Sequence, residues 1–172
     1  AVPFKHPDID VWRNNFQGIR FISEEHQYNF GGAIDDVWEK PNGQLIISDV
    51  KTTSKNEFDW EDTYNKYDYA KGYQRQLEMY QWLFKMNGYD VAPEAYIIYY
   101  NGKKNEPFFD KKLEFDEHVI KLDCSTDWVE EKVIATANLI RSDEFPKPSS
   151  RCENCNYLKK RWELSQKINN ER

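Results

Sequence analysis

Two charged residues end an apolar run in the first half of the chain. The stretch Leu45–Thr53 reads LIISDVKTT, so Asp49 and Lys51 follow residues that suit a buried strand. Side chains two residues apart on a strand project from the same face, roughly 6–7 Å apart along the chain. At this spacing, a carboxylate and an ammonium form either a surface ion pair or two charges presented to a metal ion and a phosphate.

A pair of acidic residues precedes this stretch. The segment GGAIDDVW places Asp35 and Asp36 after two glycines, which let another group approach the backbone closely. The turn EKPNG at 39–43 predicts a hairpin that folds this strand back beside Asp49. Neighbouring carboxylates repel each other unless a cation lies between them, and with a strand-end carbonyl they suit Mg²⁺. An acidic solvated face is the alternative.

A third polar pair lies on an amphipathic helix expected at 73–88. Gln76 and Tyr80 are four residues apart and share one face of that helix. They either occupy an ordinary half-buried helix face or point toward the same site as the acidic pair.

The remaining pattern predicts one α/β domain with a mixed central sheet flanked by helices. No internal repeat is present, and residues 54–72 show no clear period, which indicates a loop. The core is expected at about 18–145, followed by a cysteine-containing basic segment at 146–172. A short helix is expected at 9–16 and a longer one at 125–145, and strands are expected at 18–25, 28–39, 43–53, 94–102 and 111–122.

Composition narrows the function classes. The net charge is −6, which argues against a nonspecific nucleic-acid binder. The whole acidic excess lies in residues 1–70, the half that contains Asp35 and Asp49. No apolar run approaches the ~20 residues of a membrane span. Cys124, Cys152 and Cys155 are too few for a disulfide framework, so a reducing cytoplasm is expected.

Together, the three polar pairs carry a family resemblance. G-x-x-D at 32–35, D-x-K at 49–51 and Q-x-x-x-Y at 76–80 resemble the motifs of the PD-(D/E)XK nuclease superfamily in order and spacing. The similarity is closest to the RecB-type branch, with the nuclease domains of RecBCD and AddAB enzymes and CRISPR-associated exonucleases. It covers roughly residues 20–102 and implies a restriction-endonuclease-like core.

The resemblance implies a metal centre. Asp35 and Asp49, with the Val50 carbonyl, would hold Mg²⁺ or Mn²⁺, which activates water and holds the scissile phosphate. Asp35 fills the motif position, whereas Asp36 points to the opposite strand face and is expected to be structural. Lys51 would orient or deprotonate the water, or neutralise charge on the phosphate.

The resemblance also implies a substrate. Gln76 and Tyr80 would hold a DNA strand or support Lys51, so a DNA nuclease acting on ends or single strands is expected. A helicase or another repair or defence protein is an implied partner. The alternative is an inactive nuclease-fold module that binds nucleic acid or a partner protein.

Two groups of residues depart from the RecB-type pattern. Its upstream motif histidine has only His6 and His26 as candidates here. Many relatives hold an iron-sulfur cluster on four cysteines, which three cysteines do not supply. A remnant pair at Cys152 and Cys155 is therefore expected, without a cluster.

Basic and aromatic residues are candidates for strand contacts. The aromatic residues Trp60, Tyr64, Tyr67 and Tyr69 either stack on unpaired bases or pack the loop at 54–72 onto the sheet. The expected phosphate contacts are Lys103, Lys104, Lys111, Lys112, Lys159, Lys160 and Arg161.

Overall fold

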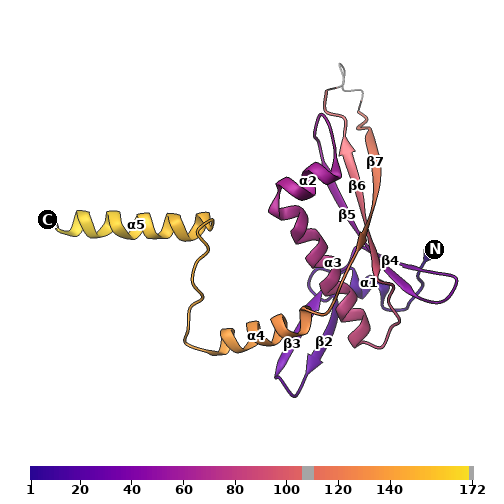
Figure 1. Ribbon diagram of the computed structural model, residues 1–172, viewed down its shortest axis with the longest axis horizontal. Coiled ribbons are helices and arrows are strands. Elements are labelled where there is room, and N and C mark those ends of the chain that lie inside the picture. Colours follow the sequence, from indigo (N-terminus) through magenta and orange to yellow (C-terminus); the bar gives the residue numbers. More distant parts are fainter. Residues whose placement is uncertain (106–110, 171–172) are drawn as a thin grey trace. The chain divides into compact units, whose positions relative to one another are not determined.

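A computed structural model describes residues 1–105 and 111–170 of the chain (Figure 1). These residues form two compact units, Ala1–Ala135 and Thr136–Arg172, and each is described by itself. Within the described residues, no helix is long and apolar enough to cross a membrane.

A five-stranded mixed sheet forms the centre of the first unit. Its order is β1-β4-β5-β6-β7, with β5 and β6 parallel and the other neighbours antiparallel. The strands are β1 (Val2–Pro3), β4 (Asp36–Glu39), β5 (Leu45–Thr53), β6 (Glu94–Gly102) and β7 (Phe115–Asp123). The predicted α/β class, with helices flanking a mixed sheet, is confirmed.

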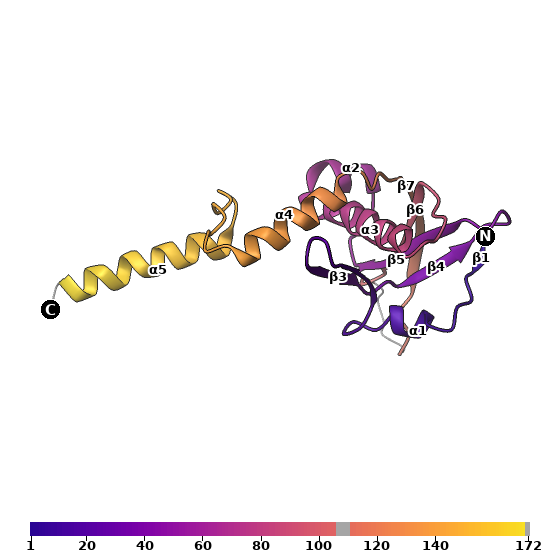
Figure 2. The ribbon, with the colours of Figure 1, turned by 90° about the horizontal axis from the view of Figure 1, so that it is seen from below.

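One long helix covers a face of this sheet. Helix α3 (Asp68–Met86) crosses the strands in Figure 2 and buries Leu77, Leu83 and Phe84. Ile47 of β5 is completely buried in the same core. An apolar stripe on a helix and an alternating strand face bury each other, which is the main source of stability in such a layer.

The strand expected at 28–39 is wrong as a single element. It divides into β3 (Tyr28–Gly32), which pairs with β2 (Ile19–Ser23) in a separate hairpin, and β4 in the main sheet. Between them the Ile34 amide donates to the Trp12 carbonyl of helix α1 (Ile9–Trp12), and the Ile34 side chain is buried. A long-range hydrogen bond and burial therefore redirect the chain at this point.

The loop expected at 54–72 is also wrong. Helix α2 (Trp60–Lys66) occupies its middle, and α3 begins at Asp68 rather than Tyr73. The Asp59 carboxylate caps α2 by accepting the Asp62 amide hydrogen at 2.8 Å. Tyr67 has an extended backbone and separates the two helices.

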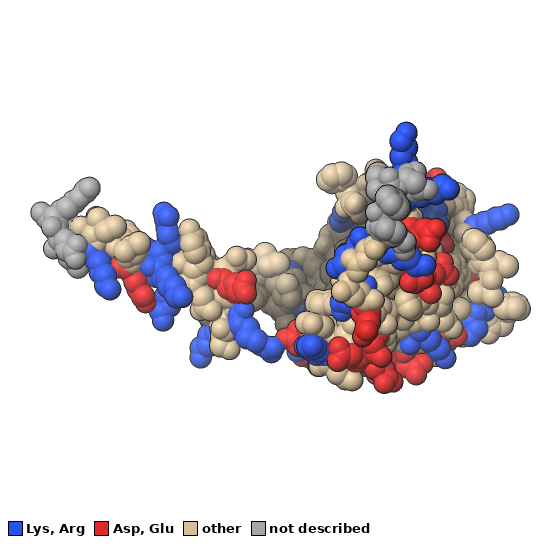
Figure 3. Space-filling model, turned by 90° about the horizontal axis from the view of Figure 1, so that it is seen from above, with Lys and Arg blue, Asp and Glu red and all other residues tan. Residues whose placement is uncertain are grey.

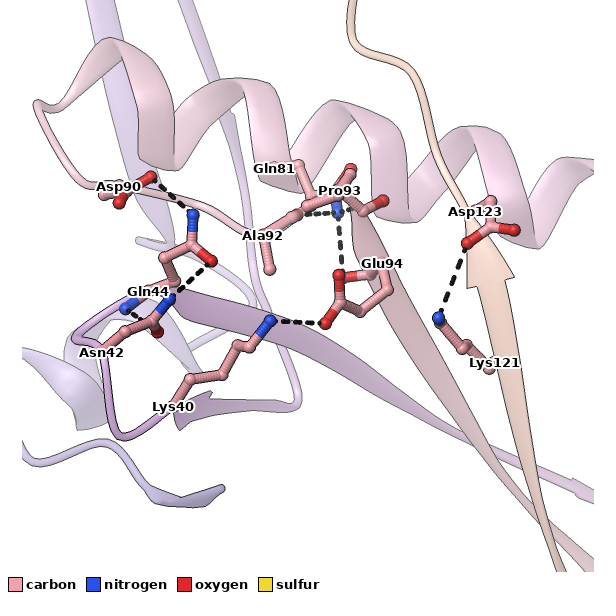
Figure 4. Close-up of polar contacts among 10 residues, drawn as sticks. All are labelled: Lys40, Asn42, Gln44, Gln81, Asp90, Ala92, Pro93, Glu94, Lys121 and Asp123. Atoms are coloured by element: carbon pink, nitrogen blue, oxygen red, sulfur yellow. Dashed lines mark hydrogen bonds and ion pairs between the residues drawn. The ribbon is translucent and has the colours of Figure 1, made fainter.

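Polar contacts join the turn after β4 to the start of β6 and to α3 (Figure 4). The Gln81 side chain of α3 donates to the Ala92 carbonyl at 3.0 Å, just before β6 begins. Lys40, in the turn after β4, forms an ion pair with Glu94 at 2.8 Å. These contacts tie the hairpin turn, the helix and β6 together at the end of α3 remote from its first turn.

The second unit is helical. Helix α4 (Val129–Arg141) begins in the first unit and ends in the second, which also contains α5 (Glu153–Asn170). Lys and Arg side chains project along α5 in Figure 3. Cys152 and Cys155 form a disulfide at the start of α5, a pairing that the cysteine count did not predict.

Candidate active site

The hairpin between β4 and β5 brings two carboxylates together. The register pairs Asp36 with Ser48, so Asp35, one residue earlier, lies opposite Asp49. The Val50 amide donates to Asp35 Oδ2 at 2.7 Å, which fixes the Asp35 carboxylate against β5. Asp35 is exposed, whereas Asp49 retains only 2% of its surface. One carboxylate thus faces solvent and the other closes the bottom of the site.

Asp49 places a carboxyl group in a buried position. Its Oδ1 accepts a hydrogen bond from Gln76 Nε2 at 3.3 Å, and its Oδ2 is in ion-pair contact with Lys51 Nζ. Among residues 1–105 and 111–170, the Lys51 ammonium is thus the polar contact of the buried Oδ2. Burial raises the pKa of the Asp49 carboxyl, Lys51 opposes this rise, and the Asp35 charge adds to it.

Gln76 orients two groups at once. Its Nε2 donates to Asp49 Oδ1 and also to the Tyr80 hydroxyl, the latter at 2.8 Å. Burial raises the pKa of Tyr80, and the charges of Asp49 and Asp35 add to the rise. The Gln76 hydrogen bond lowers this pKa but does not cancel the rise. The phenol therefore stays protonated and can donate its own hydrogen toward the site.

Gly32 is required where Tyr80 reaches the site. A Cβ at this position would lie 2.5 Å from Tyr80 Cε1, closer than carbon atoms can approach. The group that approaches Gly32 is therefore the Tyr80 ring. The G-x-x-D spacing combines a carboxylate with the space that the helix side chain needs.

Arg13 supports the acidic segment, and sequence reasoning missed it. Its Nε donates to the Asp35 carbonyl at 3.1 Å, and its guanidinium forms an ion pair with Asp36. Trp38 Nε1 donates to the other oxygen of Asp36 at 3.0 Å. Asp36 thus has structural partners, while Asp35 keeps its carboxylate toward β5. No sequence signal links Arg13 to a strand more than twenty residues away.

Lys51 lies between the acidic pair and a group of tyrosines. Its ammonium is 4.8 Å from the centroid of the Tyr73 ring on α3. Tyr99, which lies beside Lys51 across the parallel β5–β6 pair, is buried. Burial, with the neighbouring Tyr73 and Tyr69, raises the pKa of Tyr99 to about 12. Sequence reasoning assigned no role to Tyr73 or Tyr99.

Both candidate histidines have partners elsewhere. His6 stacks on Trp12 at 4.4 Å, its Nδ1 accepts the Asp8 amide, and its Nε2 lies 3.2 Å from the Tyr89 hydroxyl. His26 follows β2 and stacks on Tyr28 at 6.4 Å.

Other predicted residues lie outside this cluster. Lys103 pairs with Asp116 at 3.2 Å, and Lys104, Lys111 and Lys112 are exposed between β6 and β7. The basic residues Lys159, Lys160 and Arg161 are exposed on α5. Cys124 is a half-buried thiol whose pKa is raised to about 12 by desolvation, and Cys152 is bonded to Cys155.

The two carboxylates of Asp35 and Asp49 have the chemistry of ligands for a divalent cation. Within residues 1–105 and 111–170, no three His, Cys, Asp or Glu side chains gather into a metal-binding group. The candidate donor set is instead two carboxylates, Asp35 and Asp49. Carboxylate oxygens are the ligands that a hard cation such as Mg²⁺ takes, and Asp49 Oδ2, which now contacts only the Lys51 ammonium among the described residues, would be available to it.

A comparison with known protein families assigns the chain to one of them. The family model of the PD-(D/E)XK nuclease superfamily matches residues 7–159. The chain belongs to the PD-(D/E)XK nuclease superfamily. Members of this superfamily are typically nucleases that use divalent metals, and their fold is consistent with the sheet and helices described above.

Other comparisons add little to the family assignment. No curated protein sequence matches this PD-(D/E)XK chain. The solved crystal structure of SSO0001 is similar, with a TM-score of 0.41 and 14% sequence identity. The match covers 72% of this chain and 48% of that one, so the chain spans about half the length of SSO0001.

Proposed function

We propose that the protein is a Mg²⁺- or Mn²⁺-dependent nuclease that hydrolyses DNA phosphodiester bonds at ends or in single strands. The observation that carries the proposal is the buried Asp49 carboxylate, opposite Asp35 and in ion-pair contact with Lys51. Burying the Asp49 carboxylate costs free energy that a surface ion pair would not need to spend, which favours a role in binding or chemistry.

Each residue of the cluster has a distinct role in this proposal. Asp35, Asp49 and the Val50 carbonyl would hold the metal ion, which lowers the pKa of bound water and offsets negative charge on phosphate. Lys51 exchanges its ion pair with Asp49 for the attacking water or the phosphate oxygens. Gln76 fixes the rotamer of Asp49 by a hydrogen bond.

Tyr80 contributes a protonated phenol. Its hydroxyl already accepts a hydrogen from Gln76, so its own hydrogen is directed to the substrate strand. Because its pKa is raised, the phenol remains a donor throughout the neutral pH range. Donors held in advance at a developing charge are the strongest contributors to such catalysis.

We further propose membership of the RecB-type branch, action in the cytoplasm and, as a partner, a helicase or another repair or defence protein. The Q-x-x-x-Y pair supports the RecB-type assignment, because Gln76 and Tyr80 both lie at the acidic centre. The location and the partner are what that assignment implies. We also propose that the chain is one nuclease domain with a basic C-terminal segment, and that it binds no iron-sulfur cluster. The support for the absence of a cluster is that the chain has three cysteines, whereas a cluster takes four.

Cleavage of labelled single-stranded and duplex DNA tests the proposal. We expect product with Mg²⁺ or Mn²⁺ and none in EDTA, and Asp35→Asn and Asp49→Asn should both abolish cutting. A single- and double-stranded RNA arm separates DNA from RNA specificity. Binding of DNA without cleavage under any metal would instead indicate an inactive nuclease-fold module.

A further inference from the structure

A row of tyrosines leads away from the acidic centre along one stripe of α3. Tyr69, Tyr73, Gln76 and Tyr80 follow the i, i+4, i+7, i+11 spacing, so they share a single helix face. The two C-terminal members contact each other at the Asp49 carboxylate. The two N-terminal members therefore extend the same face beyond the reaction centre.

The rings along this stripe touch in sequence. The Lys51 ammonium is 4.8 Å from the Tyr73 ring, and Tyr73 meets Tyr69 edge-on at 5.6 Å between centroids. Tyr67 stacks on Tyr69 at 5.4 Å with 24° between the ring planes. A continuous set of rings thus connects Lys51 to the α2–α3 junction.

The outer pair remains accessible. Tyr67 and Tyr69 keep 37% and 41% of their surface exposed, whereas buried Tyr99 lies beneath the row. The other two aromatic residues of this segment follow the packing alternative: Trp60 lies against the Tyr99 ring, and Tyr64 donates to Gln74 at 2.5 Å. The structure therefore separates packing aromatics from accessible ones.

Two lysines accompany the accessible pair. The Lys55 and Lys66 ammonium groups are 5.1 and 5.5 Å from the Tyr67 ring centroid. Lys55 is held in place, because buried Asn101 accepts its amide hydrogen at 2.8 Å and donates to its carbonyl at 3.0 Å. The Lys55 ammonium also donates to Thr63 Oγ1 at 3.0 Å.

Rings and ammonium groups alternate here as they do in proteins that bind unpaired strands. Bases stack on aromatic faces, and the backbone between them is neutralised by lysine. Nearby acids such as Asp68 lie in first helical turns, where they stabilise the helix dipole. In a duplex, the base faces are already stacked on one another and are not available to tyrosine.

We propose that Tyr67, Tyr69 and Tyr73, with Lys55 and Lys66, form a binding track that delivers a single nucleic-acid strand to Lys51 and Asp49. This inference rests on the proposed nuclease function for the direction of the strand, although binding by the track is separable from cleavage. The tyrosines bind the strand and take no part in the chemistry.

Binding in EDTA tests the track apart from cleavage. Fluorescence anisotropy with labelled oligothymidylate compares wild type with the double variants Tyr67→Ala/Tyr69→Ala and Tyr67→Phe/Tyr69→Phe. The alanine pair should weaken binding about 5- to 100-fold, and the phenylalanine pair should stay within about twofold, since the ring rather than the hydroxyl stacks. Phe16→Ala removes an aromatic ring that is 92% exposed and should have no effect.

Further arms identify the ligand and guard against misfolding. A blunt DNA hairpin should bind with the same affinity to wild type and the alanine pair, and oligouridylate replaces oligothymidylate to compare RNA with DNA. Lys55→Gln and Lys66→Gln should each reduce the salt slope of binding by about one unit or less. If the alanine pair does not melt cooperatively, Tyr67→Leu and Tyr69→Leu, which keep more apolar bulk than alanine but no ring, replace it with the same expected loss.

Two binding results would overturn the track. One is wild-type binding of oligothymidylate no tighter than that of a folded alanine or leucine variant. The other is an equal loss of binding in the phenylalanine pair. Tyrosine-dependent binding without cleavage in Mn²⁺ would leave the track standing and reject the nuclease function. Cleavage with a KM that is unchanged in the tyrosine variants would reject the track and leave the nuclease function standing.

Discussion

Asp35 Oδ2 accepts the amide hydrogen of Val50 at 2.7 Å, one residue beyond Asp49. This bond joins the start of β4 to the middle of β5 and sets the two carboxylates opposite each other. Asp35 itself is outside the regular strand and exposed. Its position is therefore set by the backbone of β5, which also carries Asp49 and Lys51.

Metal binding should depend on Asp35 and Asp49 and not on Asp36. Asp49→Asn should remove Mn²⁺ binding measured by calorimetry, because one of only two carboxylate donors loses its charge. Asp36→Asn is the matched control, since its carboxylate is engaged by Arg13 and Trp38. An unchanged isotherm in Asp49→Asn would place the metal elsewhere.

Without metal, Asp49 should lower the free energy of unfolding at neutral pH. Its folded pKa is raised from the ordinary value of 3.8, so the folded state holds a proton that the unfolded state has released. Stability therefore falls as pH rises from about 4 toward the raised pKa, and the loss persists at pH 7.

Melting curves in EDTA measure this effect. At pH 7, Asp49→Asn should melt at a higher temperature than wild type, and the difference should shrink near pH 3, where Asp49 is protonated in both states. Adding Mn²⁺ should raise the Tm of wild type alone. A variant less stable than wild type at pH 7 in EDTA would show that the Lys51 ion pair outweighs the cost of burial.

Strand and helix patterns reached much of this arrangement from sequence. The apolar run of β5 and the Asn-Gly turn predicted the pairing of Asp35 with Asp49, because both signals are local. Residues 94–102 likewise match β6 in full. The Gln76 and Tyr80 pair was placed on a helix face by spacing alone, and α3 carries both.

Features that depend on distant contacts were not accessible in this way. Helix α2 has seven residues, too few for a hydrophobic period to stand out. The break at Ile34 depends on the Trp12 carbonyl, and the role of Arg13 depends on where the hairpin folds. Tyr99 gains its place only because β6 lies parallel to β5.

Gly32→Ala should damage the site through Tyr80. The added Cβ would displace the Tyr80 ring and with it the hydrogen bond to Gln76, costing about 1–3 kcal/mol of stability. Cleavage should fall about ten- to hundredfold, since small misplacements near the reacting groups have effects of this size. Gly72→Ala in α3 is the control, because its Cβ meets open space. Equal activity in the two variants would contradict the role assigned to Tyr80.

Arg13→Ala should weaken metal binding, although Arg13 is not itself a proposed ligand. Losing the hydrogen bond to the Asp35 carbonyl should loosen the backbone that carries this ligand and lower Mn²⁺ affinity about 10- to 100-fold. Arg20→Ala provides a control, since Arg20 contacts Gln17, Asn29 and the Phe16 carbonyl instead. Identical Mn²⁺ affinity in Arg13→Ala and Arg20→Ala would remove Arg13 from the site.

The rate of DNA cleavage by Lys51→Ala tests the central claim most directly. Under single-turnover conditions at saturating Mn²⁺, the variant should cut single-stranded DNA about 10²- to 10³-fold more slowly than wild type, because a preorganised charge at the phosphate is lost. Its Mn²⁺ isotherm should remain close to that of wild type, because Lys51 is not a ligand. If the ion pair with buried Asp49 has only a structural role, its loss should lower the Tm in EDTA and leave the chemical step unchanged. Cleavage by Lys51→Ala at the wild-type rate would contradict the account.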